Sequence, residues 1–126
     1  MKNFPKIFPI IVFFLLSCEE NNQNDENQYE YTAYYGKSLV VCALGTIEIN
    51  MNADSSFTGK WEIEARGSFT ESDIGPQIGS GEMVGNIKKG EFFLSLNPNW
   101  RDNNITLHGL KLNSDYAGAW FYSTFV

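Results

Sequence analysis

The chain has 126 residues, a formal net charge of −6 at pH 7 and 43% hydrophobic residues. This length supports one folded domain. The acidic balance argues against nucleic acid as a partner, because such recognition depends on lysine and arginine side chains that neutralise phosphates. It equally argues against electrostatic adhesion to anionic lipid headgroups.

Residues 1–17 have the pattern of a secretory leader. Lys2 and Lys6 provide a positively charged start, and residues 7–16 follow as an apolar segment. This segment is too short to cross a bilayer, whose core requires about 20 helical residues. Ser17 then supplies the small residue that is expected before a cleavage site.

Cys18 ends the run Leu15-Leu16-Ser17-Cys18, which resembles the lipobox of bacterial lipoproteins. The resemblance implies cleavage before Cys18 and attachment of fatty chains, palmitate among them, to its thiol and amine. Two or more such chains hold a protein stably on a membrane. The resemblance therefore implies a lipid-anchored protein of the bacterial cell envelope, on the periplasmic or the surface face of the outer membrane. The alternative is an ordinary secretory leader in which Cys18 is a coincidence.

Residues 18–28 are predicted to be the lipidated cysteine and a disordered tether. Residues 19–28 include no apolar side chain, so they cannot bury enough surface to offset the entropy of the chain. Glu19 and Glu20, directly after the cysteine, resemble the surface-export signals of some bacterial lipoproteins. Their other interpretation is a solvated linker.

The folded domain is predicted over residues 29–126, and most of it alternates apolar and polar residues with a period of two. The apolar members of successive runs are Ile47, Ile49 and Met51; Phe57, Trp61, Ile63 and Ala65; Phe92, Leu94 and Leu96; and Ile105 and Leu107. Such alternation gives one dry and one wet face, as in antiparallel sheets. At Gly109 the alternation slips so that Leu110 and Leu112 resume it, which predicts a β-bulge. Residues 29–35 form either a first strand or an ordered arm.

Short polar turns are expected at residues 52–55, 88–90 and 113–115, and longer loops at 72–80 and 97–104. No segment has a convincing helical period. Consecutive hairpins of this kind predict an all-β fold, an antiparallel up-and-down meander of about seven or eight strands. Closure into a small barrel removes the two open edges that otherwise invite aggregation. A β-sandwich is the alternative.

An aromatic-x-Gly-x-Trp pattern occurs twice, at residues 57–61 and 116–120. A glycine between two large rings on one strand face lets a facing backbone approach or a coiled strand bend. Together with the glycine-rich run at residues 80–90, this pattern resembles the small secreted β-barrels of the lipocalin-like and avidin-like type over about residues 45–124. Lipocalins carry their Gly-x-Trp near the start of the barrel, whereas this chain has it mid-domain and at the end. The resemblance therefore carries over no binding residue.

No motif for nucleophilic, zinc-dependent or phosphate-binding catalysis occurs in the sequence, so we expect a non-enzyme without cofactor or metal. Cys42 is the one thiol of the domain, lies in an apolar run and is expected to be buried. His108, the one histidine, alternates with Leu107 and is expected to face solvent or the barrel rim. Glu62 and Glu64 share the wet face of a strand and are interpreted as solvated charges.

Two non-catalytic binding roles remain. In the first, a small apolar ligand occupies a lipocalin-like interior, and the candidate residues are Trp61, Trp120, Phe57 and Tyr116. The same rings are suited to filling the core of so short a domain. In the second, the barrel is a protein-interaction or inhibitory module on a lipid tether. Its candidate surface comprises Trp100 and Arg101 in a loop, and Phe93, Phe121 and Phe125 on the phase opposite to the core residues.

Overall fold

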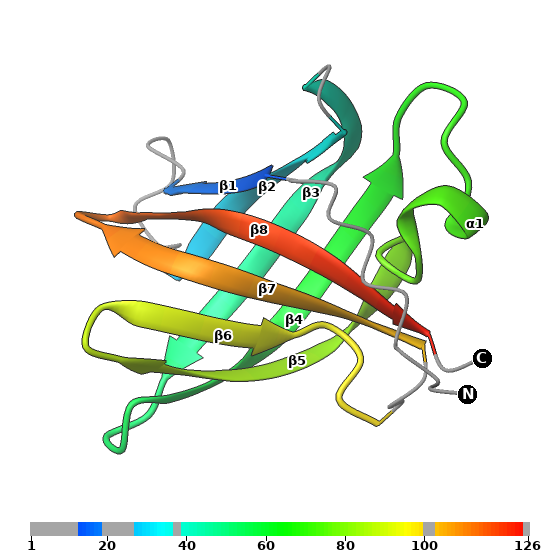
Figure 1. Cartoon of the computed structure of the whole chain (residues 1–126). Coiled ribbons are helices and arrows are strands. Elements are labelled where there is room, and N and C mark those ends of the chain that lie inside the picture. The colour runs from blue at the N-terminus through cyan, green and yellow to red at the C-terminus, as the bar shows by residue number, and fades with distance from the viewer. Residues whose placement is uncertain (1–12, 19–26, 37–38, 100–102, 125–126) are drawn as a thin grey trace, which may run out of the picture.

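The computed structural model describes residues 13–18, 27–36, 39–99 and 103–124. Within these ranges, antiparallel strands follow one another around a closed barrel in which the last strand pairs with the first (Figure 1). The strands are β1 (Phe13–Cys18), β2 (Gln28–Tyr35), β3 (Val40–Met51), β4 (Ser56–Ala65), β5 (Gly79–Lys88), β6 (Glu91–Ser95), β7 (Asn103–Leu112) and β8 (Asp115–Thr124), with the short helix α1 (Glu71–Ile74) between β4 and β5. The predicted up-and-down barrel is confirmed, and the sandwich alternative is wrong.

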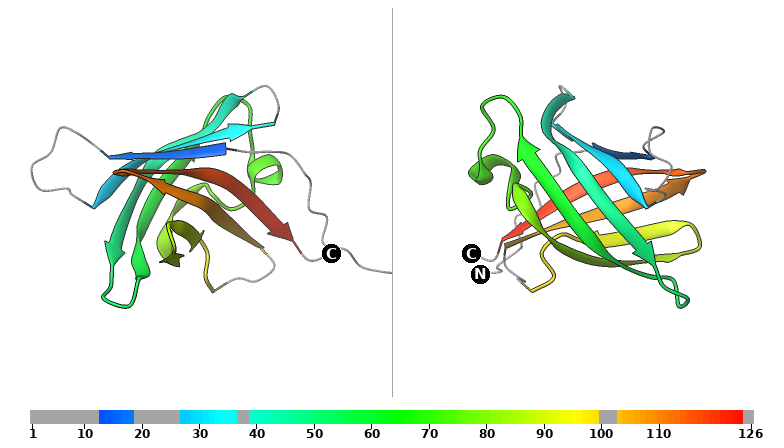
Figure 2. Two further views of the ribbon diagram at one scale, coloured as in Figure 1. Left: turned by 60° about the vertical axis from the view of Figure 1, so that its left-hand side comes forward. Right: turned by 180° about the vertical axis from the view of Figure 1, so that it is seen from behind.

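Two walls of the barrel cross at a steep angle. Strands β6, β7 and β8 face the viewer in Figure 1, and β3 and β4 cross behind them; the view from behind in Figure 2 brings β3 and β4 forward. Helix α1 lies at one end of the barrel, and the β5–β6 and β7–β8 hairpins lie at the other. Among the described residues, none belongs to a helix with the length and apolarity needed to cross a membrane.

Side-chain alternation along the strands produces the core, as the sequence predicts. The predicted inward residues that are buried are Ile47, Ile49, Phe57, Trp61, Ile63, Phe92, Leu94, Leu96, Ile105 and Leu107. Their neighbours on β4, among them Thr58, Glu62 and Glu64, are exposed. Met51 shares the phase of Ile47 but is exposed, because it is the last residue of β3.

The β-bulge predicted at Gly109 is wrong. Strand β7 pairs with β8 in one uninterrupted register from Asn103 to Leu112, so Leu110 and Leu112 stay out of the core and are each 54% exposed. Gly109 keeps its phase because it faces Gly118 across the ladder, where a Cβ on either residue would overlap the backbone of the other strand. A register shift does occur elsewhere, between Ala33 and Tyr34 in the β2–β3 ladder.

The glycines of the two aromatic-x-Gly-x-Trp runs permit close strand approach, as predicted. A Cβ on Gly59 would overlap the carbonyl oxygen of Glu48, and one on Gly118 would overlap that of His108. Gly81 serves a different purpose, because a Cβ there would lie 3.0 Å from the indole of Trp61. The small residues therefore draw the ladders together and leave room for a large ring.

Helix α1 was not predicted from the sequence, because a single turn is too short to show a helical period. It lies across the start of the predicted 72–80 loop and is capped at Thr70, whose backbone N–H donates to Asp73 Oδ2 at 2.9 Å. Its last residue, Ile74, is fully buried, as is Gln77 beyond it. This loop therefore covers one end of the barrel and contributes to the core.

Strand β1 comprises residues that the sequence assigns to the leader and the lipid-bearing cysteine. It pairs with β2 on one side and with β8 on the other. An apolar segment can take this place because Leu16 enters the core, where it is 0% exposed. Strand β2 then begins at Gln28, one residue before the predicted domain start. Most of the predicted leader and tether, residues 1–12 and 19–26, lies outside the described residues.

Candidate functional site

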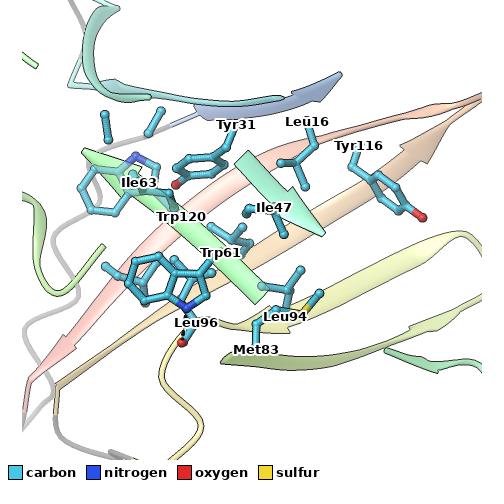
Figure 3. Close-up of a cluster of buried hydrophobic side chains, with 14 of the residues drawn as sticks. Leu16, Tyr31, Ile47, Trp61, Ile63, Met83, Leu94, Leu96, Tyr116 and Trp120 are labelled. Carbon is cyan, nitrogen blue, oxygen red and sulfur yellow. Dashed lines mark hydrogen bonds between the residues drawn. The ribbon is translucent and has the colours of Figure 1, made fainter. Parts of the chain in front are cut away.

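All four residues predicted to bind a ligand lie inside the barrel. Trp61 and Trp120 are each 4% exposed, and Phe57 and Tyr116 are less exposed still. Figure 3 shows Trp61, Tyr116 and Trp120 pointing into the same interior as aliphatic residues from other strands. The structure therefore brings the candidates together, but as parts of one hydrophobic core.

Tyr116 lies at the centre of an aromatic group in this interior. Its ring makes edge-to-face contacts with Phe92 at 5.1 Å, Tyr29 at 5.3 Å and Phe57 at 6.4 Å between centroids. Such edge-to-face pairs are favourable beyond the area that they bury. Burial, followed by the neighbouring Tyr29, raises the pKa of Tyr116 to about 12. The hydroxyl is therefore neutral at physiological pH.

The polar atoms of the buried rings are bonded to the protein itself. The indole N–H of Trp61 donates to the carbonyl of Leu96 at 2.8 Å, and that of Trp120 donates to the carbonyl of Tyr34 at 3.2 Å. Among the described residues, every buried side-chain nitrogen or oxygen has a hydrogen-bond partner. Polar groups that fix a ligand in an apolar pocket would instead be directed at free space.

A buried tyrosine connects the barrel wall to the loop at its end. The hydroxyl of Tyr31 donates to Gln77 Oε1 at 2.6 Å, and Gln77 Nε2 donates to the carbonyl of Ile74 at 2.8 Å. Burial, with a smaller contribution from Cys42, raises the pKa of Tyr31 well above its usual value. Gln77 was not predicted as a core residue, because a glutamine after Gly75-Pro76 has the composition of a solvated loop.

Cys42 is buried, as predicted. Its Sγ lies 3.5 Å from the carbonyl oxygen of Ala33. Burial raises the pKa of the thiol to about 11, so the reactive thiolate is scarce at neutral pH. This environment suits a structural side chain and disfavours a nucleophile.

Two aromatic residues lie outside, on the surface that we call the outer β6–β8 face. Phe93 and Phe121 are 45% and 41% exposed, which agrees with the outward phase predicted for both. Phe93 is paired with His108, and their rings stack at 4.1 Å with an interplanar angle of 10°. Phe121 is paired with Thr106, which lies on β7 two residues before His108. On β7, Thr106 and His108 therefore lie between the two phenylalanines, and the exposed Leu110 continues the same outward row.

Polar and apolar groups adjoin on the outer β6–β8 face. His108 Nε2 contacts the carboxylate of Glu91, and that carboxylate is half exposed. On the neighbouring strand β5, Val84 is 43% exposed and pairs with Ser95. His108 thus faces outward, as predicted. The other predicted interaction residues, Trp100, Arg101 and Phe125, lie outside the described residues.

A shallow groove of about 990 Å³ lies on the opposite wall, over the outer side of β2 to β5. Its lining includes Glu30, Glu62 and Glu64, with Arg66 3.4 Å from Glu64. These side chains are solvated, as predicted for Glu62 and Glu64. Among the described residues, no group of three or more histidine, cysteine, aspartate or glutamate side chains could hold a metal ion.

Comparisons with protein-family models, with curated proteins and with solved structures each gave no match. The features that bear on function are therefore those of the molecule itself: a core filled by aromatic and aliphatic side chains, and exposed rings on the outer β6–β8 face.

Proposed function

We propose that this protein is a lipid-anchored lipoprotein of the bacterial cell envelope whose barrel binds another protein through the outer β6–β8 face. The observation that supports the binding role is that some aromatic residues are buried in the core and others are exposed on the surface. Trp61, Trp120 and Tyr116 are buried in the core, whereas Phe93 and Phe121 are directed outward. Exposed rings on a rigid sheet, bordered by polar groups, have the composition of a protein interface.

Interior binding of a small apolar ligand, as in lipocalin-like barrels, is less well supported. A pocket for such a ligand occupies about 300–1,000 Å³ and is lined by apolar side chains. The rings that were expected to line it pack against one another, and their indole N–H groups are bonded to backbone carbonyls. A ligand would have to displace these contacts and leave buried donors unpaired, which is costly.

A catalytic role has little support among the described residues. The histidine that could act as a base, His108, stacks on an exposed ring and contacts an exposed carboxylate. Both side chains are at least a third exposed, so the pair does not lie in an enclosed site. The thiol of Cys42 is buried and protonated, as described above.

The anchor is supported by the sequence alone: a positively charged start, a short apolar segment and the lipobox-like run that ends at Cys18. Residues 19–26 would link the anchor to the barrel, and eight residues span at most about 29 Å. The barrel would then remain close to the membrane surface, and its partner would be another protein of the envelope.

Photo-crosslinking in intact cells tests the binding surface. A photoreactive residue is placed at Phe93 or Phe121, and at Thr58 on the exposed side of β4 as a matched control. The proposal predicts one discrete adduct from positions 93 and 121, and none from position 58. Equal labelling from all three positions, or none from positions 93 and 121, would reject this surface.

Cell fractionation tests the anchor. The variant Cys18→Ser should release the protein from membranes, and continued membrane fractionation would contradict the anchor.

A further inference from the structure

We infer that the mature barrel has a slot one strand wide between β2 and β8, and that this slot binds an extended peptide segment of a partner protein. The segment carries an aliphatic side chain at the place that Leu16 occupies in the full chain. This inference rests on the proposed function, because cleavage before Cys18 is what would remove residues 13–17. The slot would be a second binding site beside the outer β6–β8 face, because the edge of β8 forms one of its two borders.

Residues 14–16 are paired on both sides, whereas Phe13 is paired with β8 alone and Ser17 with β2 alone. On the β2 side, Leu16 is paired with Tyr31; on the β8 side, it is paired with Tyr116. The remaining ladders from β2 through β8 run between consecutive strands and do not depend on β1. Cleavage would therefore take one strand from the end of the meander and leave a single gap. Since neighbouring strands lie about 4.8 Å apart, β2 and β8 are separated by about two such spacings.

The two borders of the gap would be open strand edges. Open edges carry unpaired N–H and C=O groups and readily accept another strand. In the mature barrel, the open edges of β2 and β8 would face each other across the same slot. A strand that already belongs to a sheet has a neighbour on one side and can pair on the other side only. An isolated extended segment is therefore the occupant that satisfies both edges, which a second folded copy of this barrel does not.

The inward position of the slot selects an aliphatic side chain. Leu16 is completely buried between the paired residues Tyr31 and Tyr116, both of which belong to the core cluster. A charged side chain at this point would be buried away from water, which is expensive. Residues 19–28 of the chain's own tether contain no apolar residue. They cannot replace Leu16, and every described strand other than β1 is already committed to the ladders from β2 to β8. We therefore assign the segment to another protein.

Hydrogen exchange of the membrane-extracted protein tests the slot. Intact mass first establishes whether the chain starts at Cys18. The probe is a synthetic peptide of residues 11–17 with added terminal lysines for solubility, and the control is the same peptide with Leu16→Asp. We expect the first peptide to slow exchange in residues 28–35 and 115–124, but not in β4 or β5. The control should bind at least about tenfold more weakly, because burial of a leucine contributes about 1.5–3 kcal/mol.

The possible outcomes separate the two proposals. If residues 1–17 are still attached, the lipoprotein proposal and the slot both fail. If the chain starts at Cys18 but β2 and β8 are already protected and the peptide has no effect, the strands have closed on each other; the slot is then rejected and the lipoprotein proposal stands. Protection that depends on protein concentration, without peptide, would also reject the slot in favour of pairing between copies. Saturable protection that requires the leucine supports it.

Discussion

The contact between the barrel wall and its end loop gives a quantitative prediction. Replacing Tyr31 with phenylalanine removes the hydroxyl that donates to Gln77 Oε1 at 2.6 Å and keeps the ring in the core. Both side chains are fully buried, so water does not readily replace the lost donor. An unsatisfied buried polar group costs about 1–3 kcal/mol. Since a domain of this size loses about 4–8 °C in Tm for each kcal/mol, Tyr31→Phe should lower Tm by at least about 4 °C.

Thermal and urea unfolding, followed by circular dichroism, would measure this effect. Tyr34→Phe is the matched control, because Tyr34 lies on the same strand and its hydroxyl has no hydrogen bond to any described residue; its effect should stay within about 0.5 kcal/mol. Amide exchange in residues 71–79 should also become faster in Tyr31→Phe, because Gln77 holds the loop. Equal stability of the two variants, with unchanged exchange in the loop, would refute the role given to this hydrogen bond.

Three further outcomes follow from the same structure. Gly59→Val should prevent folding or destabilise it severely, because its Cβ would overlap a backbone carbonyl of β3, and urea titration would show this. The free energy of unfolding should begin to fall at about pH 8 and continue to fall towards pH 12, because burial raises the pKa of Cys42 from 9.0 to about 11 and that of Tyr116 from 10.0 to about 12, so the native state holds these protons more tightly than the unfolded chain does; a flat alkaline profile would contradict this. Phe121→Ser should abolish the adduct formed by a photoreactive residue at position 93, and Phe93→Ser the adduct formed from position 121, with a change in stability of less than about 1 kcal/mol in each case; retained adduct formation would argue against the outer β6–β8 face.

Much of the barrel could be predicted from the sequence because period-two alternation is a local property. The residues of β4 show this well: Phe57, Trp61 and Ile63 are buried, and the polar residues between them are exposed. The phase of β7 was harder to predict. Leu110 and Leu112 look like core residues by composition, but Gly109 allows β7 to continue in register and leaves both leucines outside.

Long-range pairing explains what the sequence did not predict. The buried Gln77 accepts a hydrogen bond from Tyr31, which lies 46 residues earlier in the chain, and donates one to Ile74, the last residue of helix α1. The place of Leu16 between β2 and β8 likewise depends on strands far apart in the sequence. Period-two alternation could not distinguish core rings from ligand-binding rings, because both point inward. The contacts of Trp61 and Tyr116 inside the barrel supply that distinction.

The intact mass of the protein extracted from bacterial membranes tests the central claim most directly. An anchored lipoprotein should give a chain that starts at Cys18 and carries the added mass of at least two fatty chains. Denatured, it should expose one titratable thiol, that of Cys42. A chain that starts at Met1, or one that starts at Cys18 with two free thiols and no added mass, would contradict the account.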